Sequence, residues 1–406
     1  MKKTILDNGL TVITEQTDED FVSMGYIVNK GSFDEPNDCL GIAHLAEHQV
    51  FKGTANRDKD EIWLDVQQYG GDMNAYTAEN STAFHCTILK EYWKTALDVI
   101  SDIVFNNTIP EEEFELEKSV VIEELNMYHD DATHRVMENI TKTIFRKYAN
   151  RWTNGGTPET VRNITREQLI NFINSNYIPS NITLMVTGNV KHEQICEFVS
   201  DYLEGYEFAK TSINNRVVNP IITIEDNVDT IEGIQSTMVA VWETKSSNTK
   251  ETLINEIIAH VLGGGFGSRF MDIREKYGYA YTVRADTMTF DLNEPSLMFC
   301  YTALNKNNIE KTKELIVEKL NDLDKGITQK EFNHAKAFLT SDFKKAFRCC
   351  EDANSFKLDQ YAVHDTIDKD FIIDALNSID LNDVNEFIKD MCRDMKIGFI
   401  VVEQSE

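Results

Sequence analysis

The sequence predicts an α+β fold with two homologous α/β sandwich domains, each a mainly antiparallel sheet packed with helices. The chain has 406 residues, which is long for a single hydrophobic core and suits two domains. Several stretches recur in the same order in its two halves. The expected domains are residues 1–205 and 222–406, joined by a polar, aperiodic linker at 206–221.

The repeat is visible in three pairs of segments. "AFHCTIL" from Ala83 and "MFCYTAL" from Met298 share Phe-x-x-Thr-x-Leu, and a segment of helical apolar period follows each. "IPEEEF" from Ile109 and "ITQKEF" from Ile327 share Ile-x-x-x-Glu-Phe. Upstream, "YGGDMNAYT" corresponds to "YGYAYT". Because all three pairs keep their order at nearly constant offset, we expect two copies of one α+β unit.

Each predicted unit combines strands and helices. "FVSMGYIVNKGS" and "STMVAVWETK" have the apolar, β-branched character of strands, and "NITLMVTGNV" and "MKIGFIVVEQ" close the two halves as short strands. The apolar period predicts helices at 90–105, 110–130, 133–148 and 165–176. Thr165 and Gln168 have the spacing of a capping box ahead of the last of these.

Composition limits the cellular context and the partners. The chain is 41% hydrophobic but has no apolar run long enough to cross a membrane, and no apolar segment follows the N-terminal lysines. Seven cysteines without a disulfide-like spacing fit reduced thiols, so we expect a cytoplasmic protein without a membrane partner.

The charge is strongly negative, with 68 acidic against 40 basic residues and a formal net charge of −28. This argues against nucleic acid as a partner, because phosphate binding needs clustered lysines and arginines. A solvated acidic surface that favours solubility and a long-range attraction of basic peptides are both consistent with this charge.

The stretch "GIAHLAEHQVFKGT" contains a candidate zinc-binding pattern. On a helix, His44 and His48 lie on one face and Glu47 lies beside them, so two imidazoles can reach one ion. The order His-x-x-Glu-His inverts the familiar metalloprotease motif. A five-residue pattern alone does not exclude that His44 and His48 are ordinary surface or core histidines that bind no metal.

A catalytic zinc needs a third protein ligand. "FELEKSVVIEEL" places Glu117 and Glu124 two helical turns apart on one face, and Val120, Val121 and Leu125 indicate that this helix is packed. Glutamates on helices are usually solvated, so the spacing alone does not choose between solvent and metal for Glu124.

These segments together resemble the inverted-motif zinc peptidases, the family of pitrilysin, insulin-degrading enzyme and mitochondrial processing peptidase. The family pattern continues about 75 residues later with Glu-x6-Glu, and here residues 49–123 separate His48 from Glu124. Further matching segments are "LDNGLTV", "KGSFDE", "FKGT", "MNAYT", "GTPETVRNITREQLINFINSNYIPSNITLMVTGNV" and "LGGGFGSRFMDIREKYGYAYTV". The resemblance covers nearly the whole chain. Gln49 departs from the Met that the family usually has there.

The resemblance implies a zinc site and a mechanism. His44, His48 and Glu124 would ligate zinc, Glu47 would be the general base, and Glu117 would orient the site. In the second half, Ala335 and Asp342 stand at the positions that correspond to Glu117 and Glu124. We therefore expect one zinc per chain.

The resemblance also implies substrate residues. Asn74 would lie on an edge strand that receives the substrate backbone. Arg274 and Tyr281 match the pair that reaches the substrate from the second domain, and Tyr281 could donate to the oxyanion. From the residues alone, Tyr281 would be read as core packing and Arg274 as a surface ion pair.

The expected function is a zinc endopeptidase that cleaves short or unfolded peptides. The alternatives are a non-catalytic scaffold subunit, as some relatives of the family are, and a peptidase that removes targeting sequences. Because the chain is half-size yet carries both Arg274 and Tyr281, we expect a homodimer in which one chain completes the zinc site of the other.

Overall fold

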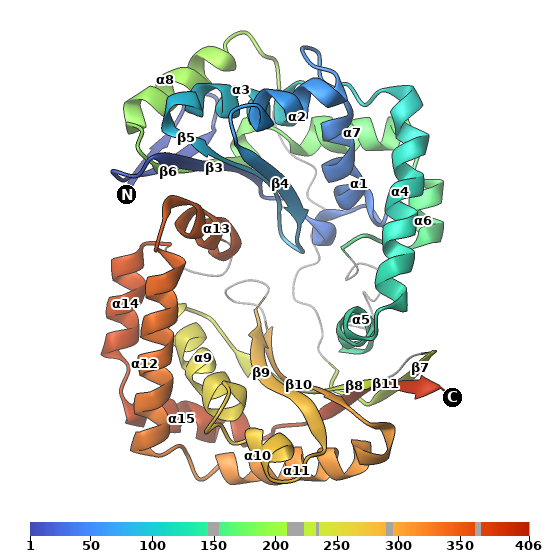
Figure 1. Ribbon diagram of the computed structural model, residues 1–406, viewed down its shortest axis with the longest axis vertical. Helices are drawn as coiled ribbons and strands as arrows, with labels where there is room; N and C mark the ends of the chain where they lie inside the picture. Colours follow the sequence, from blue (N-terminus) through green and yellow to red (C-terminus); the bar gives the residue numbers. More distant parts are fainter. Residues whose placement is uncertain (145–153, 209–222, 233–234, 290–294, 362–366, 406) are drawn as a thin grey trace. The chain divides into compact units, whose positions relative to one another are not determined.

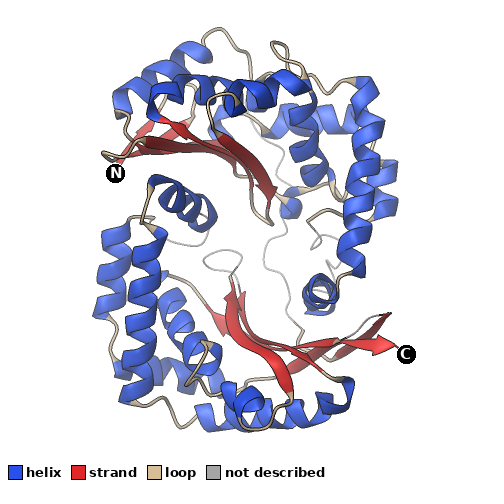
Figure 2. Cartoon of the chain, in the orientation of Figure 1, coloured by secondary structure: helices blue, strands red, loops and turns tan. Residues whose placement is uncertain are grey.

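The computed structural model describes residues 1–144, 154–208, 223–232, 235–289, 295–361 and 367–405 (Figures 1 and 2). These form two compact units, which are described separately. The first unit comprises Met1–Asn126, Asn150–Val217 and Lys345–Gln360, and the second comprises Met127–Ala149, Val218–Lys344 and Tyr361–Glu406. Most of the predicted linker at 206–221 lies outside the described residues, so the domain limits stay a prediction.

The first unit contains a six-stranded sheet in the order β1-β2-β6-β3-β5-β4. Its strands are β1 (Lys2–Ile5), β2 (Thr11–Gln16), β6 (Ile182–Gly188), β3 (Phe21–Val28), β5 (Thr82–Leu89) and β4 (Asp72–Thr77). Strands β2 and β6 are parallel, and all other neighbours are antiparallel. Strand β4 therefore forms one edge of the sheet.

The second unit contains a five-stranded sheet in the order β7-β11-β8-β10-β9. Its strands are β7 (Asn227–Glu232), β11 (Gly398–Ser405), β8 (Ser236–Lys245), β10 (Pro295–Leu304) and β9 (Ala280–Met288). Strands β7 and β11 are parallel and the other pairs are antiparallel. The order β2-β6-β3-β5-β4 has the same pattern, which confirms the predicted pair of homologous, mainly antiparallel units. Strand β9 corresponds to the edge strand β4.

Helices pack on both sheets (Figure 2). Those in the first half are α1 (Ile42–Gln49), α2 (Lys59–Gln67), α3 (Trp93–Phe105), α4 (Glu111–Asp130), α5 (Ala132–Ile144), α6 (Pro158–Asn163), α7 (Arg166–Asn176) and α8 (His192–Tyr202). Helix α3 packs on β5 and β3, α8 packs on β2, and α1 packs on the edge strand β4. The predicted capping box opens α7: the Thr165 hydroxyl accepts from the Gln168 N–H, and the Gln168 side chain accepts from the Thr165 N–H.

The second half contributes α9 (Thr249–Gly263), α10 (Met271–Glu275), α11 (Ile309–Leu323), α12 (Gln329–Ala346), α13 (Cys350–Gln360), α14 (Lys369–Ser378) and α15 (Leu381–Cys392). Helix α9 packs on β9, and α14 and α15 pack against α9. The helices of the described chain include none that is both long and apolar enough to span a bilayer.

The two halves exchange one helix each. Helix α13 packs on β3 and β6 of the first unit, and α5 packs on β8 and β11, the corresponding strands of the second unit. Lys357 of α13 is buried, where its ammonium contacts Glu15 and donates to the Thr187 hydroxyl at 2.8 Å. Arg135 of α5 pairs with Asp229 of β7 at 2.6 Å. Each unit therefore contains a helix from the other half of the sequence.

The core of the first unit lies between its sheet and the helices on it. Tyr26 and Phe84 from neighbouring strands, with Leu45 from α1, are fully buried there. Because the core includes α1, apolar burial fixes the position of this helix relative to the sheet.

Candidate metal centre

Helix α1 is held at its start by a buried carboxylate. Gly41 precedes the helix with a φ of +90°, a conformation that glycine adopts easily. Glu35 is buried and accepts hydrogen bonds from the N–H groups of Gly41 at 2.8 Å and Ala43 at 2.9 Å. These are N–H groups without an intrahelical partner, so Glu35 caps the helix and complements its dipole.

The three predicted ligands lie together. Glu124 Oε2 is 3.3 Å from His48 Nε2 and 3.9 Å from His44 Nε2. One ligand atom from each of these side chains lies within 4.8 Å of the other two, and the described residues contain no other group of this kind. Two helices that are distant in sequence, α1 and α4, thus bring two imidazoles and a carboxylate to one place.

Glu117 lies behind His48, where the sequence predicts an orienting carboxylate. Its Oε1 is 2.8 Å from His48 Nδ1, and its Oε2 is 2.7 Å from Lys52 Nζ. Burial raises the pKa of Glu117, but the hydrogen bonds from His48 and Lys52 outweigh this and hold the pKa below its ordinary value. The ionised carboxylate can only accept, so Nδ1 of His48 carries the proton and Nε2 faces Glu124.

The two imidazoles have opposite electrostatic environments. Burial lowers the pKa of His44 to about 4, and the neighbouring His48 adds to this effect. Burial also acts to lower the pKa of His48, but the hydrogen bonds to Glu117 and Glu124 outweigh it and raise the pKa to about 9. A metal bound to His48 must therefore displace a proton, whereas His44 is already neutral.

The donor set fits zinc. Two neutral imidazole nitrogens and one carboxylate form a three-ligand set typical of catalytic zinc, and α4 supplies the carboxylate that orients His48. The carbonyl of the buried Phe114, in the first turns of α4, also accepts from the Gln49 side chain at 3.1 Å, which ties α1 to α4. The unusual Gln49 thus joins the two helices that carry the ligands.

Glu47, the predicted base, is buried between α1 and the edge strand. It is 9% exposed, and its Oε2 accepts from the Thr77 hydroxyl at 2.6 Å. Burial raises the pKa of Glu47, while the hydrogen bond from Thr77 lowers it and offsets part of this effect. The arrangement provides a carboxylate that is fixed in orientation and more basic than an exposed one.

Sequence reasoning missed Lys52 and Thr77 as site residues. Both lie inside quoted segments, "FKGT" and "MNAYT", but their partners are far away in the sequence, and no local pattern indicates them. The expected packing of α4 is partly wrong. Val121 is buried, but Val120 is 47% exposed, since it lies about 100° round the helix from Val121.

The remaining predicted residues lie on two strands and a short helix. Asn74 is on the edge strand β4, with its side chain exposed and accepting from the N–H of Ala75 at 2.8 Å. Arg274 of α10 and Tyr281 of β9 belong to the second unit, and the guanidinium carbon lies 5.4 Å from the Tyr281 ring centroid. Tyr281 is 75% exposed, which excludes core packing. Arg274 also pairs with Glu275 at 3.2 Å.

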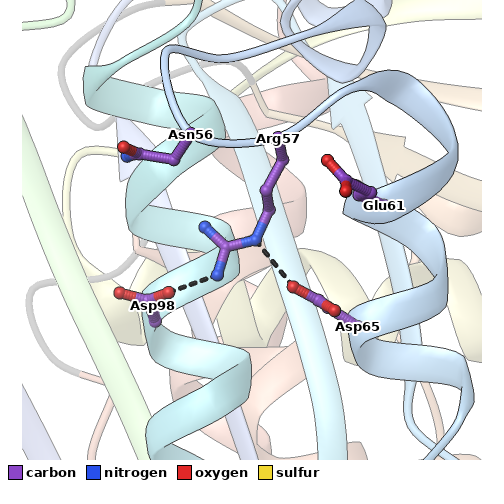
Figure 3. Close-up of a pocket in the computed structure, with 5 residues that line it drawn as sticks. All are labelled: Asn56, Arg57, Glu61, Asp65 and Asp98. Atoms are coloured by element: carbon purple, nitrogen blue, oxygen red, sulfur yellow. Dashed lines mark hydrogen bonds and ion pairs between the residues drawn. The ribbon is translucent and has the colours of Figure 1, made fainter.

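A separate charged pocket of about 410 Å³ lies beside α2 and α3, and Figure 3 shows the side chains that line it. Arg57 pairs with Asp65 at 2.9 Å, with Asp98, and with the fully buried Asp102 at 2.8 Å. The Asn56 amide also donates to Asp102 at 2.7 Å. We interpret these contacts as an anchor for the turn that leads from α1 to α2.

Comparison with family models identifies both halves of the chain. Residues 11–154 match the model described as Insulinase (Peptidase family M16), and residues 163–339 match the Peptidase M16 inactive domain. The chain belongs to peptidase family M16. The three candidate metal ligands of this M16 chain all lie within the segment that matches the first model.

Similar proteins include zinc proteases and a processing-peptidase subunit. An "Uncharacterized zinc protease YmxG" of Bacillus subtilis is 27% identical over 395 residues, which are 95% of this chain and 94% of that protein. The mitochondrial-processing peptidase subunit beta of Dictyostelium discoideum is 26% identical over 352 residues, covering 78% and 75% of the two chains.

Solved structures share the fold of this M16 chain. A protease from Helicobacter pylori has a TM-score of 0.90 at 20% identity and covers 99% of both chains. An M16-like peptidase from Alicyclobacillus acidocaldarius has a TM-score of 0.84 at 18% identity, and covers 100% of this chain and 98% of that one.

Proposed function

We propose that this protein is a zinc-dependent endopeptidase that hydrolyses short or unfolded peptides. The observation that carries the proposal is the convergence of His44, His48 and Glu124 beside the buried carboxylate of Glu47. The zinc proteases among its relatives support the same reaction. One zinc per chain is proposed, held by these three side chains and oriented through Glu117.

The residues of the chain divide the chemistry between them. A zinc ion held here would polarise the scissile carbonyl and acidify the attacking water. Glu47 would accept the proton of that water and later deliver it to the leaving amine. The Thr77 hydroxyl fixes one oxygen of Glu47, so the other oxygen would exchange the proton. The raised pKa of Glu47 favours this role because it makes the carboxylate a stronger base.

The edge strand offers a way to bind the substrate backbone. Strand β4 packs against the metal helix α1 and has a sheet neighbour, β5, on one side. An extended peptide would add to its other side as a further strand and place a peptide bond near Glu47. Asn74 on this strand and Arg274 and Tyr281 from the second unit are the proposed substrate contacts. Strand addition needs an extended backbone, so folded proteins would be excluded.

The decisive experiment compares the wild-type protein with Glu47→Gln in cleavage of a quenched fluorescent peptide. We expect cleavage to fall at least about 100-fold, since a general base contributes 10²–10⁴-fold, while the zinc content stays that of the wild type. Gln keeps the shape of Glu but cannot take the proton. Full activity in Glu47→Gln would end the proposed mechanism.

Two alternatives use the same fold. The second candidate is a non-catalytic subunit, which the match of residues 163–339 to the Peptidase M16 inactive domain favours. A scaffold would cleave no peptide even when loaded with zinc. A targeting-sequence peptidase, favoured by the processing-peptidase relative, would cleave basic presequence peptides in preference to neutral ones of equal length.

We propose that the working form is a homodimer. We also propose a cytoplasmic location, because seven free cysteines are typical of a reducing compartment. In this assembly, Arg274 and Tyr281 of one chain complete the zinc site of the other. Mixing Glu47→Gln chains with Arg274→Ala chains tests the sharing. Activity of the mixture above that of the Arg274→Ala chains alone supports a shared site, and activity that does not rise above that level contradicts it.

A further inference from the structure

An exposed aromatic ring lies beside the two predicted substrate residues of the second unit. Phe266, which follows α9, is 73% exposed, and its ring centroid is 5.9 Å from the guanidinium carbon of Arg274. The same carbon is 5.4 Å from the ring centroid of Tyr281, which is 75% exposed. Arg274 is therefore in contact with two rings, only one of which belongs to the pair identified from the sequence.

The loop that carries Phe266 is closely packed at its base, Gly263 and Gly264, and has open space at its tip, Gly265 to Gly267. A Cβ added to Gly263 would lie 2.1 Å from the backbone nitrogen of Ala285, and one added to Gly264 would lie 2.2 Å from His260 Nδ1. Gly265 and Gly267, on either side of Phe266, have φ values of +100° and +92° and open space around them. The glycines thus fix the base against β9 and α9 and allow the tip to present the ring.

The other end of the loop is also anchored. Arg269 donates to Glu331 at 2.7 Å and to the carbonyl of Gly326 at 2.9 Å. Phe266 is thus attached to a loop that is held at both ends, which keeps its ring near Arg274.

Arg274 also pairs with a neighbouring carboxylate. Its Nε is 3.2 Å from Glu275 Oε1, and both side chains are partly exposed, at 41% and 48%. An ion pair in contact with water is weak, and so is one exposed cation–π contact. A guanidinium stacked on aromatic faces keeps its in-plane N–H donors free, whereas the ion pair with Glu275 occupies one of them.

We propose that Phe266 is a positioning residue for Arg274. It holds the face of the guanidinium against Tyr281, so that the N–H donors that Glu275 does not occupy face the carbonyl or carboxylate oxygens of an extended peptide. This inference rests on the proposed function, in which Arg274 binds the substrate. Phe266 itself takes no part in the chemical step.

The test is a double-mutant cycle between Phe266 and Arg274. Phe266→Leu keeps an apolar side chain but removes the aromatic face, and Phe266→Trp restores such a face. We expect Phe266→Leu to raise KM about 2- to 5-fold with kcat unchanged, as one exposed cation–π contact predicts, and Phe266→Trp to keep the wild-type KM. Phe371→Leu is the control, since Phe371 is another exposed aromatic residue, on α14, and should leave KM unchanged.

The coupling distinguishes positioning from a general loss of structure. In the Arg274→Ala background, Phe266→Leu should have no further effect on KM, because the group that it positions is gone. An undiminished effect in that background, or an unchanged KM in Phe266→Leu alone, overturns the inference.

A binding measurement separates failure of this inference from failure of the proposed function. The same cycle is measured as the Kd of a fluorescent peptide for proteins that also carry Glu47→Gln. Coupling in Kd without any hydrolysis by the wild-type protein would reject the peptidase and keep the role of Phe266. Normal hydrolysis by the wild-type protein without coupling in Kd would keep the peptidase and reject the role of Phe266. If the peptide bound to none of these proteins, both proposals would be rejected.

Discussion

Nδ1 of His48 lies 2.8 Å from Oε1 of Glu117, and this hydrogen bond joins helix α1 to helix α4 behind the candidate metal centre. The other oxygen of Glu117 contacts Lys52. The imidazole is thereby fixed in one orientation, and the contact with Glu117 keeps the proton on Nδ1 when a metal displaces the one on Nε2.

Glu117→Gln should weaken zinc binding about 10- to 100-fold, because the amide no longer stabilises the orientation and basicity of His48. Zinc affinity is measured by competition with a chromophoric chelator. Glu115→Gln is the matched control on the same helix, since its side chain is 73% exposed. Equal affinities for the wild type and Glu117→Gln would contradict the role given to this carboxylate.

Glu124→Gln should reduce the zinc content to well below one ion per chain, because an amide oxygen is a weaker ligand than a carboxylate. Metal analysis after dialysis against a weak chelator measures this. Glu123→Gln changes the exposed neighbour of Glu124 and should keep the full zinc content. Zinc retained by Glu124→Gln at the wild-type level would mean that another group is the third ligand.

Thr77→Val should move the acidic limb of the pH profile of kcat/KM to higher pH. The hydrogen bond from Thr77 lowers the pKa of Glu47, so its removal raises that pKa, and the base stays protonated up to a higher pH. Thr87→Val, which removes a hydroxyl that bonds Ser23 on the same sheet, should leave the profile unchanged. An acidic limb that stays in place would show that Thr77 does not tune the base.

Asp102→Asn should lower the free energy of unfolding by about 1–3 kcal/mol, because it leaves a buried hydrogen-bond network incomplete around Arg57. Burial raises the pKa of Asp102, but hydrogen bonds from Thr54, Asn106 and Arg57 outweigh it and lower the pKa. Urea unfolding measures the change. Asp65→Asn, at a side chain that is 37% exposed, should cost less than about 1 kcal/mol. Equal losses of unfolding free energy in Asp102→Asn and Asp65→Asn would contradict the conclusion that burial makes Asp102 the more important partner of Arg57.

In Glu331→Gln, the free energy of unfolding should depend less on pH in the acidic range than it does in the wild type. Burial raises the pKa of Glu331, but Arg269 and Thr328 outweigh it and lower the pKa from its ordinary value of 4.5 to about 2. Its contribution is therefore complete above about pH 4.5 and is lost as the pH falls through about 2. Unfolding midpoints of zinc-free protein between pH 5 and 3 should converge for the wild type and Glu331→Gln. A constant difference would refute this assignment.

Local sequence patterns predicted the elements of the fold well. The helix expected at 165–176 is α7 (Arg166–Asn176), and the segment "STMVAVWETK" is strand β8. These predictions succeed because apolar period and capping chemistry act over a few residues. The exchange of α5 and α13 was not predictable in this way, since an amphipathic helix does not specify which of two similar sheets it covers.

The sequence by itself determined the duplicated architecture, because the repeats keep their order along the chain, and it identified His44 and His48 as ligand candidates through their spacing on one helix; Glu124 was added by the resemblance to the inverted-motif zinc peptidases. Only the tertiary structure decided that Glu124 meets the two histidines, that Lys52 and Glu117 support His48, and that Thr77 holds Glu47. Each of these contacts joins residues at least 30 positions apart, and the placement of α1 beside α4 and β4, not any local pattern, sets the distances between them.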